Sequence, residues 1–148
     1  MSKELQTIDV TKLVEYTKLI SDIGGLNKMM APNYLRDFIN AMDVTSSMLS
    51  KATKAQLNAE SELKRAEAIA YLDKAGDYLS ERGIKDTAES RKKYIDVDSD
   101  VLAAKDKVAA ATAMVTFLKN KYQAFRCAHD DVKKISFNEV QGTAFEGF

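Results

Sequence analysis

The longest feature of the sequence is an apolar stripe with coiled-coil spacing between Val101 and Val132. Apolar or aromatic residues, together with one histidine, recur every three or four positions, at Val101, Ala104, Val108, Ala111, Val115, Leu118, Tyr122, Phe125, His129 and Val132. No Pro or Gly interrupts residues 98–135. The pattern therefore predicts one helix over about 98–135, roughly 57 Å long at 1.5 Å per residue.

A helix of that length exceeds the width of a compact domain of 148 residues. It would gain stability from a partner along its length, so we expect the chain to form a homo-oligomer. The side chains predicted at the oligomer interface are Val101, Val108, Val115, Leu118, Tyr122, Phe125 and Val132.

The start of this helix contains three aspartates at alternate positions, in the segment DVDSDVLAAKDK over residues 96–107. A calcium-binding EF-hand loop needs Gly at its sixth position and a bidentate Glu at its twelfth, where this segment has Val101 and Lys107. The alternative is a helix start, with Asp98 or Ser99 as N-cap and Asp100 favourably placed in the first turn. We therefore predict a helix start and no metal site.

The first half of the chain predicts one short and one long helix. Residues 9–22, DVTKLVEYTKLISD, have an amphipathic pattern that Gly24 and Gly25 end. Pro32 suits the first turn of a helix predicted over about 33–81, with a stop at Gly83 and a place to bend or split at Thr45-Ser46-Ser47. The apolar face expected in its second half comprises Leu63, Ala66, Ile69, Leu72, Gly76 and Leu79.

A basic link over residues 82–97 separates the two long helices. Asp86 and Glu89 form a capping-box pattern for a short helix that carries Arg91, Lys92 and Lys93. The fold class predicted is all-α, with one domain over residues 1–135: a long antiparallel helical hairpin with short accessory helices. Residues 136–148 lack periodicity and are predicted to form a flexible tail, whose Phe137, Phe145 and Phe148 could dock on a partner.

Composition excludes several classes of function. Twenty-two Lys and Arg balance 22 Asp and Glu, so bulk charge favours neither nucleic acid nor a membrane as partner. The chain has no apolar run of about 18 residues and no apolar signal sequence, and its lone Cys127 fits a reducing cytosol. With one His, no Cys-x-x-Cys pair and no Gly-rich phosphate loop, we expect neither an enzyme nor a cofactor. Cys127 and His129 cannot meet, because residues two apart on a helix point to different faces.

Local charge is more informative than the total. Residues 82–93 contain five cations and two acids, followed by Tyr94, and residues 119–126, KNKYQAFR, combine three cations with Tyr122 and Phe125. Basic side chains contact phosphates and aromatic rings stack on bases, so these patterns are typical of sequence-independent binding to single-stranded DNA. Ordinary solvated helix faces remain the alternative. The predicted DNA contacts are Lys64, Arg65, Lys74, Arg82, Lys85, Arg91, Lys92 and Lys93.

Residues 94–135 resemble the C-terminal half of the UvsY-type recombination mediators of tailed phages. The resemblance lies in an acid-x-acid-Val-Leu helix start over 98–102 and in a long helix that closes in a basic-aromatic stretch and Ile135. Upstream, Asp77, Tyr78, Ser80, Arg82 and Gly83 are similar to the family's Asp-Tyr helix end and Ser-x-Arg-Gly turn. The resemblance covers about residues 45–135.

The resemblance implies a small α-helical protein that forms a ring-like homo-oligomer in the bacterial host cytoplasm. Members of the family bind single-stranded DNA and help to load a RecA-type recombinase onto strands coated by single-strand-binding protein, without nucleotide hydrolysis. The residues alone leave a second class open, a helical coiled-coil adaptor or virion-assembly protein that does not bind nucleic acid. Convergence of the cations at 64–74 and 82–93 on one surface would favour the mediator.

Overall fold

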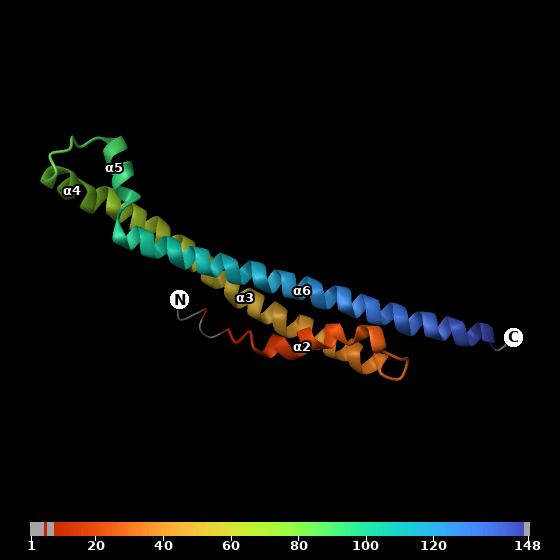
Figure 1. The fold of residues 1–148 in the computed structure, drawn as a ribbon. Coiled ribbons are helices and arrows are strands. Elements are labelled where there is room, and N and C mark those ends of the chain that lie inside the picture. Colours follow the sequence, from red (N-terminus) through yellow and green to blue (C-terminus); the bar gives the residue numbers. More distant parts are fainter. Residues whose placement is uncertain (1–4, 6–7, 147–148) are drawn as a thin grey trace. The chain divides into compact units, whose positions relative to one another are not determined.

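The computed structural model describes Leu5 and residues 8–146, with side chains as far as Phe137, and all regular secondary structure in this part is helical (Figure 1). This confirms the all-α prediction. The elements are α2 (Lys12–Ser21), the 3₁₀ turn η1 (Ile23–Gly25), α3 (Ala31–Ile69), the π-turn η2 (Ala70–Lys74), α4 (Ala75–Glu81), α5 (Ala88–Ile95) and α6 (Ser99–Glu146). Among the described residues, no helix has both the length and the apolar character that crossing a membrane requires.

Helix α3 begins at Ala31, close to the start predicted near residue 33, with Pro32 in its first turn. It passes through Thr45-Ser46-Ser47 without interruption, so the predicted split there is wrong. The hydroxyl of Thr45 donates to the carbonyl oxygen of Ala41, 2.6 Å away, and is satisfied inside the helix.

Two predictions at the ends of elements are wrong. Helix α5 starts one residue later than the capping-box pattern implies, because Thr87 is extended and its hydroxyl accepts from the backbone N–H of Ser90 at 3.1 Å. Helix α6 continues to Glu146, past the end predicted near residue 135 and through most of the predicted flexible tail. No Pro interrupts this segment, and a helix can continue without an apolar stripe. Phe137 is exposed there, whereas Phe148 and the side chain of Phe145 lie outside the described part.

The chain divides into two compact units, where the sequence predicts one domain. Unit 1 contains Met1–Gln6 and Ala52–Val115, and unit 2 contains Thr7–Lys51 and Thr116–Phe148. Each unit therefore takes one segment from α3 and one from α6.

Unit 2 has a core of large side chains. Leu13 of α2, Phe38 of α3, and Leu118 and Phe125 of α6 are almost completely buried. The ring of Phe125 meets that of Tyr16 edge-on, with centroids 6.1 Å apart. These contacts hold α2 against α6.

Alanines predominate in the core of unit 1, beside the larger Leu79, Val101 and Val115, and their small size lets helices approach closely. The buried alanines are Ala52, Ala55 and Ala59 on α3, Ala70 and Ala75 beside the π-turn, and Ala104 and Ala111 on α6. Gln56 on α3 donates to Thr112 on α6 at 3.2 Å, and Glu62 pairs with Lys107 at 3.5 Å. A residue later in α3 therefore contacts a residue earlier in α6, which shows that these two segments run in opposite directions.

The stripe from Val101 to Val132 is core within one chain. Val101, Val115, Leu118, Phe125 and Val132 are at most 6% exposed, and Val108 and Tyr122 are half-buried. The helix is as the spacing predicts. Five of the seven side chains predicted at the oligomer interface are covered by the chain itself, so in this conformation they are not available to a second copy.

The π-turn moves the buried face of the helix that precedes the basic link. Buried Ala70 and Ala75 are five residues apart, and the Ala75 N–H donates to the Ala70 carbonyl. Leu79, predicted on the apolar face, is buried, whereas Ile69 and Leu72 of the same predicted face are 41% and 69% exposed. At the first position the buried residue is Ala70 instead of Ile69, and after it the extra residue of the π-turn changes the phase of the helix by about one position, which leaves Leu72 exposed.

Candidate functional site

Six of the eight predicted DNA-binding cations lie in one part of unit 1, residues 70–98, here termed the α4–α5 end. Helix α4 stops at Gly83, whose φ of +64° favours glycine, and the chain then reverses. Backbone N–H groups of Gly83 and Ile84 donate to the carbonyls of Ser80 and Leu79 at 3.2 and 3.0 Å. This Schellman-type end places α5 beside α4.

Arg91 fastens α5 to the π-turn. Its Nε and Nη2 donate to the two carboxylate oxygens of Asp86 at 2.7 and 2.8 Å, and Nη1 donates to the carbonyl oxygen of Tyr71 at 2.7 Å. The approach uses the missing side chain of Gly76, where a Cβ would lie 3.3 Å from Nη2. The hydrogen bonds from Arg91 lower the pKa of Asp86. Arg91 therefore acts as a structural clamp, with its charge already paired.

Asp98 joins α5 to the start of α6. Its carboxylate is 4% exposed and accepts from the Tyr94 hydroxyl at 2.7 Å and from the backbone N–H groups of Asp100 and Val101, both at 3.1 Å. Burial raises the pKa of Asp98, but the hydrogen bonds from Tyr94, Val101 and Lys74 outweigh it, so the pKa lies below its ordinary value. Asp98 is thus the N-cap, as one of the two sequence alternatives predicts.

Lys74 is the second cation with a structural role. Its amine lies 3.4 Å from Asp98 and 2.5 Å from Asp100, and the bond to Asp100 is the main cause of its raised pKa. The third aspartate, Asp96, lies 3.9 Å from Lys105. Lysines thus balance the aspartates of the D-x-D-x-D segment, and no group of His, Cys, Asp and Glu suited to a metal ion occurs in the part of the chain that the structure describes.

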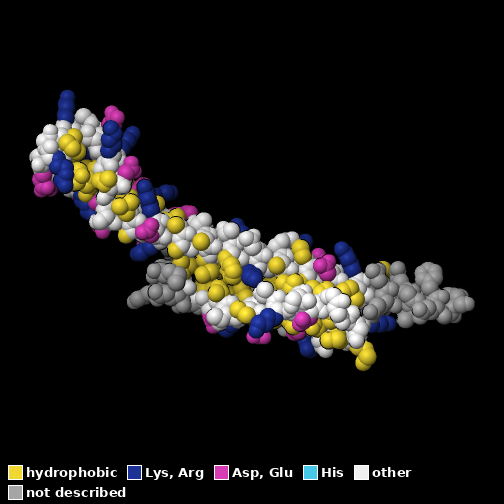
Figure 2. Space-filling view, in the orientation of Figure 1, with side chains coloured by type: hydrophobic (Ala, Val, Ile, Leu, Met, Phe, Trp, Pro, Cys, Tyr) yellow, Lys and Arg dark blue, Asp and Glu magenta, His cyan; other side chains and the backbone are white. Residues whose placement is uncertain are grey.

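The other predicted cations lie on the surface. Lys64, Arg65, Lys85 and Lys92 are exposed, and the structure shows no ion pair for these four among the described residues. Lys93 meets Glu89 at 3.7 Å with both side chains largely exposed, a weak pairing in water. Figure 2 shows Lys and Arg side chains projecting from this end at the upper left, with acidic ones between them. On the visible face they do not form one continuous patch.

A groove between α4 and α5 adds aromatic surface to these cations. The rings of Tyr78 and Tyr94 lie 4.7 Å apart between centroids, tilted by 44°, and the guanidinium of Arg82 lies 3.6 Å from the centroid of Tyr78. Ile84 and Lys93 also line the groove, which encloses about 400 Å³. Sequence reasoning noted Tyr94 beside the cations but did not pair it with Tyr78. The signal was the Gly83 turn, which brings the two helices together.

No protein family, curated protein or solved structure matches the chain. The geometry of its own residues therefore carries the functional argument.

The second basic-aromatic stretch, residues 119–126, belongs to unit 2 and is used differently. Phe125 is buried against Tyr16, and Tyr122 is half-buried. Phe125 packs within the unit and is not free to stack on bases. This stretch therefore adds no support for DNA binding, and Phe125 serves in it as a core residue of the Val101–Val132 stripe.

Proposed function

We propose that the protein is a phage recombination mediator that binds single-stranded DNA at the α4–α5 end. In this proposal it promotes loading of a RecA-type recombinase onto strands coated by single-strand-binding protein, in the host cytoplasm. The observation that carries the proposal is the combination of exposed Arg82, Lys85, Lys92 and Lys93 with the Tyr78–Tyr94 groove. The same residues lie in the segment that resembles the UvsY-type mediators.

The chemistry suits a single strand. Ammonium and guanidinium groups neutralise phosphates without reading sequence, and unpaired bases offer flat apolar faces to a site that contains aromatic rings. The groove is lined by one aromatic ring from each helix, and only an unpaired base exposes its face to such rings. Duplex DNA would present phosphates alone.

An oligomer would strengthen such contacts. Two or three phosphate contacts per subunit give weak binding, but several subunits on one strand act together through a high effective concentration. The proposed assembly is a ring of subunits, in each of which α3 and α6 form an antiparallel hairpin. Support for the hairpin comes from the opposed α3 and α6 segments in unit 1.

The test is anisotropy of a labelled oligothymidylate titrated with the full chain at several salt concentrations. Replacing Lys85, Lys92 and Lys93 by Ala should weaken binding and flatten the salt dependence, by about 0.7 in log–log slope for each phosphate that is no longer neutralised. A matched control replaces the exposed Lys28, Lys51 and Lys54, which lie outside this end. Arg91 is left intact because its replacement would undock α5.

A folded, oligomeric wild-type protein without single-strand binding at low salt would contradict the mediator. The second candidate, a helical adaptor that does not bind nucleic acid, would then be preferred. It is favoured by the exposure of Ile84 and Val97, which at 46% and 56% both line the α4–α5 groove and give it an apolar lining suited to a protein partner.

A further inference from the structure

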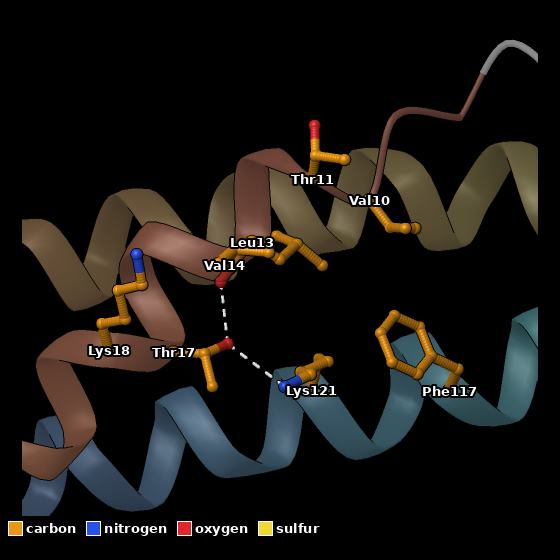
Figure 3. Close-up of a pocket in the computed structure, with 8 residues that line it drawn as sticks. All are labelled: Val10, Thr11, Leu13, Val14, Thr17, Lys18, Phe117 and Lys121. Carbon is orange, nitrogen blue, oxygen red and sulfur yellow. Dashed lines mark hydrogen bonds between the residues drawn. The ribbon is translucent and has the colours of Figure 1, made fainter.

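Unit 2 contains an apolar groove that the proposed DNA site does not use. Val10, Leu13 and Val14 line one side and Phe117 of α6 lines the other, around a volume of about 340 Å³ (Figure 3). Val14 is 49% and Phe117 40% exposed, so the apolar lining is open to solvent. The volume is at the lower end of the range for ligand pockets, about 300–1,000 Å³.

Two lysines give the groove a positive charge. The amine of Lys121 donates to the hydroxyl of Thr17 at 3.1 Å, and that hydroxyl donates to the carbonyl of Leu13 at 2.7 Å. These partners are neutral, and the structure shows no carboxylate paired with Lys121 among the described residues, so its charge is held at the groove without compensation. Lys18 adds a second charge, only weakly offset by the exposed Glu15 at 3.6 Å. None of the described residues lining the groove is acidic.

The same chain contains a segment with the complementary chemistry. Residues 136–148, SFNEVQGTAFEGF, carry Glu139 and Glu146 and no cation, and they include Phe137, Phe145 and Phe148. Large apolar side chains suit the Val and Phe lining, and the carboxylates suit the two amines. We propose that the groove of one copy binds the 136–148 segment of a second copy.

The geometry of α6 excludes binding within one chain. Lys121 and the segment lie on the same uninterrupted helix, which continues to Glu146. At 1.5 Å per residue, Phe145 lies about 36 Å along the axis from Lys121. A groove bound to the tail of another copy is a head-to-tail contact, which closes into a ring or continues as a filament.

This inference rests on the homo-oligomer of the proposed function and gives it an interface, in place of the buried stripe. It is independent of the cations at the α4–α5 end, because the groove belongs to unit 2. Self-association and DNA binding can therefore be measured separately.

The first experiment uses sedimentation velocity of the full chain. Lys121→Glu should shift the oligomer to monomer, while Lys119→Glu, the same charge change on an exposed residue of α6 outside the groove, should not. Adding Lys18→Glu, Glu139→Lys and Glu146→Lys to the Lys121→Glu chain should restore the oligomer, since the charges are then reversed on both sides. That rescue separates a docking contact from a general failure of folding, which circular dichroism also monitors.

The second experiment supplies the segment as a labelled 136–148 peptide. The full chain with Phe137, Phe145 and Phe148 replaced by Ser should be monomeric and should bind this peptide, at least about tenfold more weakly when Lys121→Glu is added. Equal peptide binding with and without Lys121→Glu would overturn the inference, as would a wild-type oligomer unaffected by Lys121→Glu and by the Phe replacements. In either case, if the protein still bound single-stranded DNA, the proposed function would not be contradicted. A monomeric wild type would overturn the inference and the proposed ring together.

Discussion

Replacing Asp98 tests how the α4–α5 end is joined to α6. Asp98→Ala removes the N-cap of α6, worth about 1 kcal/mol, and the charged acceptor of the Tyr94 hydroxyl, worth about 2 kcal/mol. The free energy of unfolding should fall by about 3 kcal/mol, which corresponds to about 6–12 °C in Tm for a chain of this size. Asp98→Asn should cost far less, because an amide oxygen still caps the helix and still accepts from Tyr94.

Urea and thermal unfolding followed by far-UV circular dichroism measure both variants. The informative result is which variant has the lower free energy of unfolding. Both substitutions remove the charge, but only Asn keeps an oxygen that can cap the helix. If Asp98→Ala lay within about 0.5 kcal/mol of the wild type, the range typical of surface substitutions, the reasoning about a buried cap would be refuted.

The same carboxylate gives unfolding a defined pH dependence. Because the folded pKa of Asp98 is lowered, its contribution is complete above the unfolded value of about 3.9 and is lost as the pH falls through the folded value. The wild type should therefore lose stability in acid below about pH 4, and Asp98→Asn should lack this component. An identical acid dependence in the two proteins would exclude Asp98 as its source.

Two further substitutions test the backbone features. Gly83→Ala should cost about 1–2 kcal/mol in unfolding experiments because φ is +64°, whereas Gly24→Ala, which meets no atom within 4 Å, should change little; equal effects would argue against the left-handed turn. Deleting Leu72 shortens the spacing from Ala70 to Ala75 to an ordinary helical one. The chain should still fold, but the amide hydrogens of α5 should exchange faster because α5 loses the hydrogen bond from Arg91 to the Tyr71 carbonyl. Unchanged exchange over Ala88–Ile95 would show that the π-turn does not hold α5.

Sequence periodicity predicts the helices well and their partners poorly. The Val101–Val132 spacing defines a helix face, but a heptad pattern does not specify whether the facing helix belongs to the same chain, and here the chain buries it. The predicted burial of Ile69 and Leu72 fails for another reason. Ile69 and Leu72 fit ordinary helical spacing, and the five-residue step from Ala70 to Ala75 involves alanines, whose hydrophobic signal is weak.

At the candidate site, too, the sequence predicts the helices but not how they pack against each other. Composition located the cations of residues 82–93 correctly on a turn and a short helix. It could not separate Arg91, clamped by Asp86 and the Tyr71 carbonyl, from its exposed neighbour Lys92, because that difference depends on how α5 docks. The pairing of Tyr78 with Tyr94 depends on the same docking.

The contrast between the two cores bears on which mutations each unit tolerates. In unit 2, truncating Phe38 or Phe125 leaves a cavity, at a cost of about 3–5 kcal/mol. In unit 1, where seven buried residues are alanines, enlarging Ala55 or Ala111 would push apart helices that pack closely, at a cost of about 1–3 kcal/mol. Selection should therefore act against a decrease in side-chain volume at the Phe positions of unit 2 and against an increase at the Ala positions of unit 1, although α3 and α6 contribute to both units.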